Sequence, residues 1–195
     1  MSITDRNEFM KKVDKKTKME MKLAMYGAPF LKGMKMANIM TVDKEEFADI
    51  GFVLTGTNIS YRFLKGRGKN MILYLYREHE LKDYLKSEEV QVFLRAFGYM
   101  SYDLESVLAR LSNRIYLYHD GGMEFPHEIG VFLGYPLPDV KGFVRNNGKN
   151  YLLSGYWKVY KDVEKAAKLF ERFDRERECA LQDVIEGKAI VEIAV

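Results

Sequence analysis

Two histidine–carboxylate pairs lie close together in the sequence, His119-Asp120 and His127-Glu128. Imidazole nitrogens and carboxylate oxygens can hold a divalent metal ion, and the same groups can act as a general acid and a general base. The pattern is not HExxH, because Val131 stands where the second histidine would be needed. A structural role is also open, in which His127 and Glu128 cap a helix and the first pair is exposed.

A second candidate for chemistry is the run GYWKVY, which holds the only tryptophan of the chain. In an extended strand Tyr156, Lys158 and Tyr160 would share one face, and Trp157 and Val159 the other. A lysine flanked by aromatic rings could bind a planar or anionic ligand through stacking and charge. The alternative is an ordinary half-buried strand, with Trp157 mostly buried in the core.

Three short runs rich in aromatic and apolar residues predict strands at 71–77, 115–119 and 151–160, in one common sheet. Amphipathic segments separate them, which is typical of an α/β fold: a small mixed sheet of about three or more strands, covered by helices, in a single domain. His119 and Asp120 would then follow the end of the second strand. Sites in open α/β sheets gather at the carboxyl ends of strands.

Apolar spacing and capping residues predict the helices around this sheet. Gly27 and Pro29 are expected to end the first helix, and Asp43 with Glu46 to form a capping box. The end of the chain, 189–195, fits a strand or a helix equally well. The expected helices cover residues 5–26, 44–54, 78–85, 87–97, 103–113, 125–133, 138–148 and a long segment after Asp162.

The composition is that of an ordinary globular protein, with 47% hydrophobic and 30% charged residues over 195 positions. A single cysteine, Cys179, excludes an intrachain disulfide and fits a reducing compartment. The start of the chain carries charges where a signal peptide needs apolar residues, and no apolar run is long enough to cross a membrane. These features predict a cytoplasmic protein without a membrane partner.

Positive charge is concentrated in two runs, KKVDKKTK at 11–18 and KGRGK at 65–69, although the net charge is only +3. Either run could touch phosphates, but no nucleic-acid-binding motif accompanies them, so nucleic acid is an unlikely partner. Glycines in the second run also fit a tight turn. We expect residues 1–18 to be a peripheral charged segment and residues 19–195 to form the α/β domain.

From about Met19 onward the chain resembles a family of bacterial proteins, mainly from Firmicutes, known as DUF3793, a domain of unknown function. The resemblance rests on three blocks: KLAMYGAPFLKGMKMANIM, RAFGYMSYDLESVLARLSNRI and FPHEIGVFLGYPLPDVKGFVRNNGKNYLLSGYWKVYKD. It implies no established reaction. Many family members carry cysteines at positions that Gly27 and Ser154 occupy here, so any cysteine chemistry of the family would be missing from this chain.

Two hypotheses of function follow from these residues. The first is a binding or accessory protein that meets a small molecule or a protein partner through the surface around His127 and the GYWKVY strand. The alternative is a small metal-dependent or acid/base enzyme that uses His119, Asp120, His127 and Glu128. The sequence assigns no cofactor and no metal to either.

Overall fold

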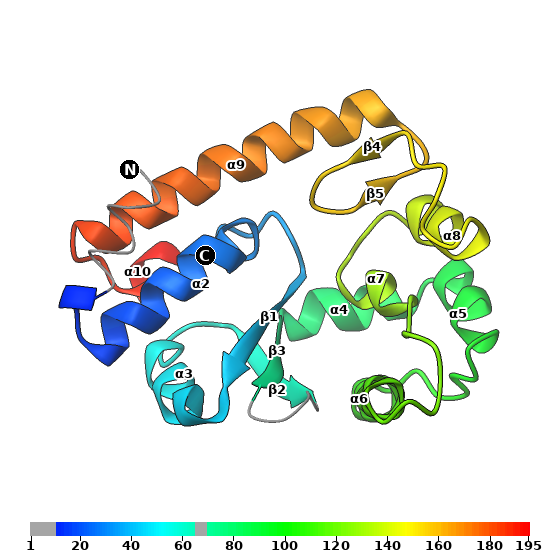
Figure 1. Ribbon diagram of the computed structural model, residues 1–195, viewed down its shortest axis with the longest axis horizontal. Helices are drawn as coiled ribbons and strands as arrows, with labels where there is room; N and C mark the ends of the chain where they lie inside the picture. The colour runs from blue at the N-terminus through cyan, green and yellow to red at the C-terminus, as the bar shows by residue number, and fades with distance from the viewer. Residues whose placement is uncertain (1–10, 65–69) are drawn as a thin grey trace.

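The computed structural model, which describes residues 11–64 and 70–195, is built around a three-stranded antiparallel sheet (Figure 1). The strands are β1 (Ala37–Asp43), β2 (Ser60–Leu64) and β3 (Asn70–Tyr76), with β3 in the centre. In the register of this sheet, Met40 of β1 faces Leu73 of β3. The strand predicted at 71–77 is therefore confirmed, whereas the two strands beside it were not recognised in the sequence.

Alternate side chains of the sheet enter two different cores, because successive residues of a strand point to opposite faces. On one face Met40, Val42, Leu73 and Leu75 are buried against helices. The helices of this layer are α2 (Lys15–Leu31), α3 (Phe47–Val53), α9 (Val163–Ile185) and α10 (Ile190–Ile193).

On the other face Ala37, Tyr74 and Tyr76 are buried in a second core. The hydroxyl of Tyr74 donates a hydrogen bond of 2.7 Å to the carbonyl of Phe132, which ties the sheet to this layer. Helices thus cover both faces of the sheet, and the predicted α/β fold class is confirmed. The helices here are α4 (Glu78–Leu85), α5 (Glu88–Arg95), α6 (Leu104–His119), α7 (Ile129–Phe132) and α8 (Leu137–Arg145).

The first helix continues past the residues expected to end it, because α2 includes Gly27 and Pro29. It ends at Leu31, and two residues later Gly33 has a φ of +68°, the left-handed conformation that glycine adopts at low cost. There the amides of Gly33 and Met34 donate to the carbonyls of Phe30 and Pro29, which is a Schellman motif. Pro29, in the last turn of the helix, has no N–H, so the helix lacks one hydrogen bond to the carbonyl of Met25.

The strand predicted at 115–119 is wrong, because these residues form the last turn of α6. Leu104, Leu108, Leu111 and Ile115 are buried at helical spacing, so the apolar face simply continues to the end of the helix. Tyr116 and Tyr118 are exposed. Their alternation with Ile115 and Leu117 imitates a strand over only four residues, a length at which periodicity does not separate the two structures.

The single strand predicted at 151–160 is also wrong, since the segment forms a separate small hairpin. Its strands, β4 (Leu153–Ser154) and β5 (Lys158–Val159), pair with each other. Figure 1 shows the hairpin under the first half of α9, away from the three-stranded sheet. At Gly155 a Cβ would lie 2.4 Å from the Phe170 ring, so only glycine permits this close approach to α9.

The remaining expectations about elements mostly agree with the structure. The capping box of Asp43 and Glu46 is present at a short 3-10 helix, η1 (Lys44–Glu46), and Asp103 caps α6. The last residues form α10, and the segment predicted as helix from 125 becomes helical only at Ile129. The KGRGK turn lies outside the described residues, and no helix within them could span a bilayer.

Candidate functional site

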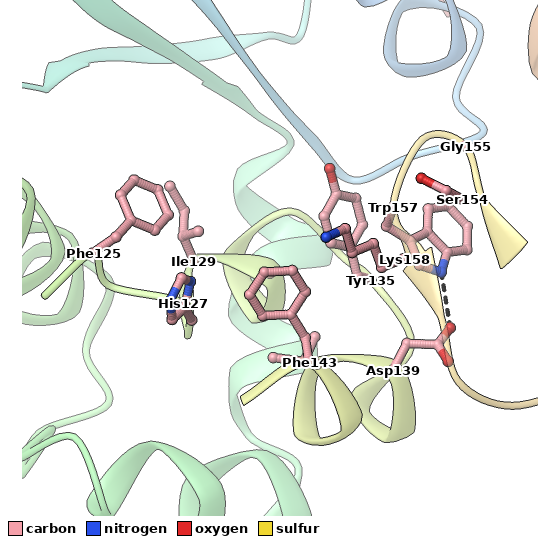
Figure 2. A pocket seen from close by; sticks show the side chains of 12 residues that line it. Phe125, His127, Ile129, Tyr135, Asp139, Phe143, Ser154, Gly155, Trp157 and Lys158 are labelled. Atoms are coloured by element: carbon pink, nitrogen blue, oxygen red, sulfur yellow. Dashed lines mark hydrogen bonds between the residues drawn. The ribbon is translucent and has the colours of Figure 1, made fainter. Parts of the chain in front are cut away.

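A pocket of about 320 Å³ lies between α7, α8 and the β4–β5 hairpin (Figure 2). Its walls are largely aromatic and apolar, with a few polar groups among them. The aromatic residues are Phe125, Tyr135, Phe143 and Trp157; the polar ones are His127, Asp139, Ser154 and Lys158; the rest are Ile129, Gly130, Val140 and Gly155. His127 and Lys158, two of the residues predicted to bind, therefore line one pocket.

Trp157 forms one wall, and its ring is fixed from several sides. The indole N–H donates a hydrogen bond of 2.8 Å to Asp139, as the dashed line in Figure 2 shows. Tyr135 stacks on the ring at 5.2 Å between centroids, and Phe170 meets it edge-on at 4.6 Å. Most of the surface of Trp157 is buried, as predicted, and the ring packs against Phe170 and Phe173 while it also lines the pocket.

Asp139, in the first turn of α8, connects that helix to the hairpin. Its side chain is almost fully buried, and its second oxygen accepts from the backbone amides of Tyr160 and Lys161 at 2.7 and 3.1 Å. Three N–H donors therefore surround one carboxylate. Asp139 is used to position Trp157 and the end of β5, and it is not available as a general base.

Lys158, in β5, brings the ammonium group into the pocket. Its Nζ donates a hydrogen bond of 2.7 Å to the carbonyl of Gly148 and lies 4.8 Å from the ring centre of Tyr151 and 5.5 Å from that of Phe143. Aromatic faces stabilise a cation in this position. Within residues 11–64 and 70–195, no carboxylate forms an ion pair with Lys158.

His127 and Glu128 are adjacent in sequence but face different surroundings. The His127 ring lies between Phe125 and Phe143, at 5.4 and 4.9 Å between centroids, and lines the pocket. Glu128 is fully buried, forms an ion pair with Arg114 and accepts a hydrogen bond of 3.1 Å from the hydroxyl of Tyr99. Burial, together with the nearby Glu128 charge, raises the pKa of Tyr99, so its hydroxyl stays protonated as a donor.

The first histidine–carboxylate pair does not join the second. His119 is the last residue of α6, not the end of a strand, and Asp120 is the exposed cap of that helix. The His119 ring contacts Tyr118, Tyr118 contacts Phe125, and Phe125 in turn contacts His127. Two aromatic rings thus link the histidines indirectly, and no group of three or more His, Cys, Asp or Glu residues in the described chain could hold a metal ion.

The three residues predicted to share one strand face do not lie together, because Tyr156 is in the hairpin turn and only Lys158 of the three lines the pocket. Lys158 lines the pocket, but the hydroxyl of Tyr156 donates to Asp174 of α9 at 3.0 Å. Burial and this hydrogen bond raise the pKa of Tyr156 to about 12. Tyr160 covers Gly142 of α8, and its hydroxyl donates to the carbonyl of Lys149. Tyr156 and Tyr160 therefore hold the hairpin to its neighbours.

Among the pocket residues that the sequence did not single out are Tyr135, Asp139 and Phe143. Asp139 and Phe143 are four positions apart on α8, so they lie on the same face of the helix. That spacing after the two prolines Pro136 and Pro138 was the available signal. A carboxylate and an aromatic ring on one helix face indicate a surface that meets another element.

The fold and this pocket define a mixed α/β protein with an aromatic cavity outside its main cores. The chain belongs to the family described as "Protein of unknown function (DUF3793)", whose model matches residues 23–194. The predicted family membership is therefore confirmed over nearly the whole chain. Neither a curated protein nor a solved structure matches it.

Proposed function

We propose that this protein binds a small planar ligand in the pocket between α8 and the β4–β5 hairpin. The observation that carries the proposal is the arrangement of aromatic rings around an unfilled volume. Phe143 lines it from α8, while Trp157 and Tyr135 line it as a stacked pair. A volume of about 320 Å³ is at the lower end of the range of ligand pockets, which suits one or two fused or linked rings.

The rings are held in place by contacts that do not need a ligand. Asp139 fixes the indole of Trp157, and Phe170 supports its edge from α9. A binding surface that is already ordered loses less side-chain entropy when a ligand enters, which favours affinity. The geometry offers no comparable observation in favour of the enzyme hypothesis, because Glu128 is already paired with Arg114.

The single tryptophan makes this proposal directly testable, because Trp157 contributes to the pocket lining and reports on it by fluorescence. The probe is 3-phenylpropanamide, a neutral aromatic molecule that does not absorb with tryptophan. We expect a saturable change in Trp157 fluorescence with a dissociation constant of about 1 mM, as a small fragment gives.

The variant Phe143→Ala removes one ring of the pocket and should weaken binding about tenfold, the effect of about 1.4 kcal/mol. The matched control is Phe52→Ala, since Phe52 is 67% exposed on α3 and does not line the pocket. Its affinity should equal that of the wild type. Absence of a saturable signal in the wild type, or equal weakening by both variants, would contradict the proposal.

A further inference from the structure

We propose that the natural ligand is an aromatic carboxylate, whose carboxyl group binds Lys158 and Ser154 while its ring lies among the aromatic side chains. This inference rests on the proposed function and specifies the class of ligand. It follows from three features of the pocket: a lysine without an ion-pair partner among the described residues, a hydroxyl group on the opposite strand, and a carboxylate whose oxygens already accept hydrogen bonds.

The cation is Lys158, the only lysine or arginine among the described residues that lines the pocket. Some lysines of the described chain pair with carboxylates, such as Lys22 with Glu46 and Lys141 with Glu89. Lys158 has instead one backbone carbonyl and two ring faces. An ammonium group has three hydrogens to donate, and the carbonyl of Gly148 uses one of them.

The hydroxyl group belongs to Ser154, which is the direct cross-strand partner of Lys158 in the hairpin register. Side chains of directly opposed residues in an antiparallel pair lie on the same face of the sheet. Both residues line the pocket, and Figure 2 shows them on the two strands of the one hairpin. Together they offer an ammonium and a hydroxyl donor to the two oxygens of one carboxylate.

Asp139 also lines the pocket and keeps its negative charge, but within the described residues it forms no ion pair with Lys158. Its two oxygens already accept hydrogen bonds from Trp157, Tyr160 and Lys161. A single positive charge with one hydroxyl matches a singly charged carboxylate. A phosphate group carries a charge of about −1.5 to −2 and would call for more cations than the lining supplies.

The test compares 3-phenylpropanoate with 3-phenylpropanamide, which have nearly the same shape and differ in charge. At low ionic strength the acid should bind about tenfold more tightly than the amide. Added salt should reduce this preference, because it screens the attraction to Lys158, and should leave the affinity of the amide unchanged. Equal affinities for acid and amide would overturn the carboxylate inference but not the pocket, whereas no binding of either would overturn both.

Variants locate the charge that is responsible. Lys158→Met should abolish the preference for the acid and keep the affinity for the amide within about twofold, and Lys158→Arg should retain the preference. The control is Lys168→Met, which removes an exposed charge from α9 and should change nothing. A loss of preference in the control as large as in Lys158→Met would show a general charge effect and refute the assignment. If Lys158→Met does not fold, Lys158→Arg and the salt dependence of the wild type decide the question.

Discussion

The chain contains two antiparallel strand regions rich in aromatic residues, and they have opposite surroundings. In β3 the rings of Tyr74 and Tyr76 lie in a core that helices cover completely. In the β4–β5 hairpin, Trp157 and Lys158 are half-buried and line a pocket. The residue types are similar, so composition alone does not decide which region forms a core and which forms a binding surface.

The polar groups of the aromatic side chains show what the two regions have in common. The hydroxyl of Tyr74 and the indole N–H of Trp157 each have a buried acceptor, Phe132 and Asp139 respectively. Buried polar groups need hydrogen-bond partners, and these two hydrogen bonds hold both rings in place. The difference is in the layers: helices pack on both faces of β3, whereas α8 and α9 flank the hairpin and leave a volume beside Trp157. A fixed ring next to an open volume is a ready surface for a ligand.

The strongest test of this comparison is to truncate one phenylalanine beside each region, Phe132 of α7 beside β3 and Phe143 of α8 beside the hairpin. Phe132→Ala should lower the free energy of unfolding by about 3–5 kcal/mol, because Phe132 is fully buried and its loss leaves a cavity. Phe143→Ala should cost only about 1–2 kcal/mol, since its ring is half-buried beside existing space. Urea denaturation measures both. Equal losses would mean that the pocket is part of the core.

The next largest effect concerns the carboxylate that fixes the hairpin. Asp139→Asn should lower the free energy of unfolding by about 2–3 kcal/mol, because an amide cannot accept from donors at both of its atoms and a buried N–H loses its acceptor. Asp174→Asn is the control, an exposed carboxylate that also binds a ring hydroxyl, and should cost less than about 0.5 kcal/mol. Similar losses in both variants would show that Asp139 does not hold Trp157 and the end of β5 in place.

A third prediction concerns Lys35, whose ammonium lies 5.5 Å from the ring centre of Tyr135, the residue that stacks on Trp157. Burial lowers the pKa of Lys35 to about 8 from 10.5. Between these two pH values the folded chain has released the proton while the unfolded chain still holds it. The unfolded state then binds more protons, so stability rises with pH across this window.

We expect the free energy of unfolding to increase by an amount on the order of 1–2 kcal/mol between pH 8 and pH 10. The comparison is with Lys35→Met, in which this increase should be absent. Both proteins contain the same tyrosines, so their ionisation cancels in the difference. Parallel pH profiles for the two proteins would show that Lys35 keeps an ordinary pKa.

The smallest effect is expected from removing residues 1–18, the segment predicted to be peripheral. Within it, residues 11–18 expose most of their side chains, and burial begins at Met19. The deletion removes the Asp14 cap of α2, which accepts from the Thr17 amide at 2.7 Å, at a cost of about 1 kcal/mol. Cooperative thermal unfolding should persist, and its loss would place the segment in the core.

Local patterns predicted the fold where local contacts decide it. The run at 71–77 is apolar on both faces, and the capping box at Asp43 depends on a residue only three positions away. The failures at 115–119 and at Gly27 have the opposite cause. Packing against the other layers extends α6 and α2 beyond the points where short-range patterns would end them.

The candidate site shows the same division between local and distant information. Residue type alone identified His127 and Lys158, because few side chains combine charge or a titratable ring with aromatic neighbours. Asp139 was missed because its role depends on Trp157, which is 18 positions away on another element. The sequence also carried no sign that Glu128 is buried and paired with Arg114, since Arg114 lies on another element, α6.

The packing of α2 along α9 also has a consequence for how the chain reaches its native state. These two helices share the longest helix–helix contact of the described structure, as Figure 1 shows, and Lys32 pairs with Asp183 across 151 positions. Closing so long a loop costs conformational entropy before any contact repays it, and contacts of this range slow folding. The burial of α2 is therefore complete only when α9 has packed against it. We expect their docking to be a late step, after neighbouring pairs such as α4 and α5 have formed.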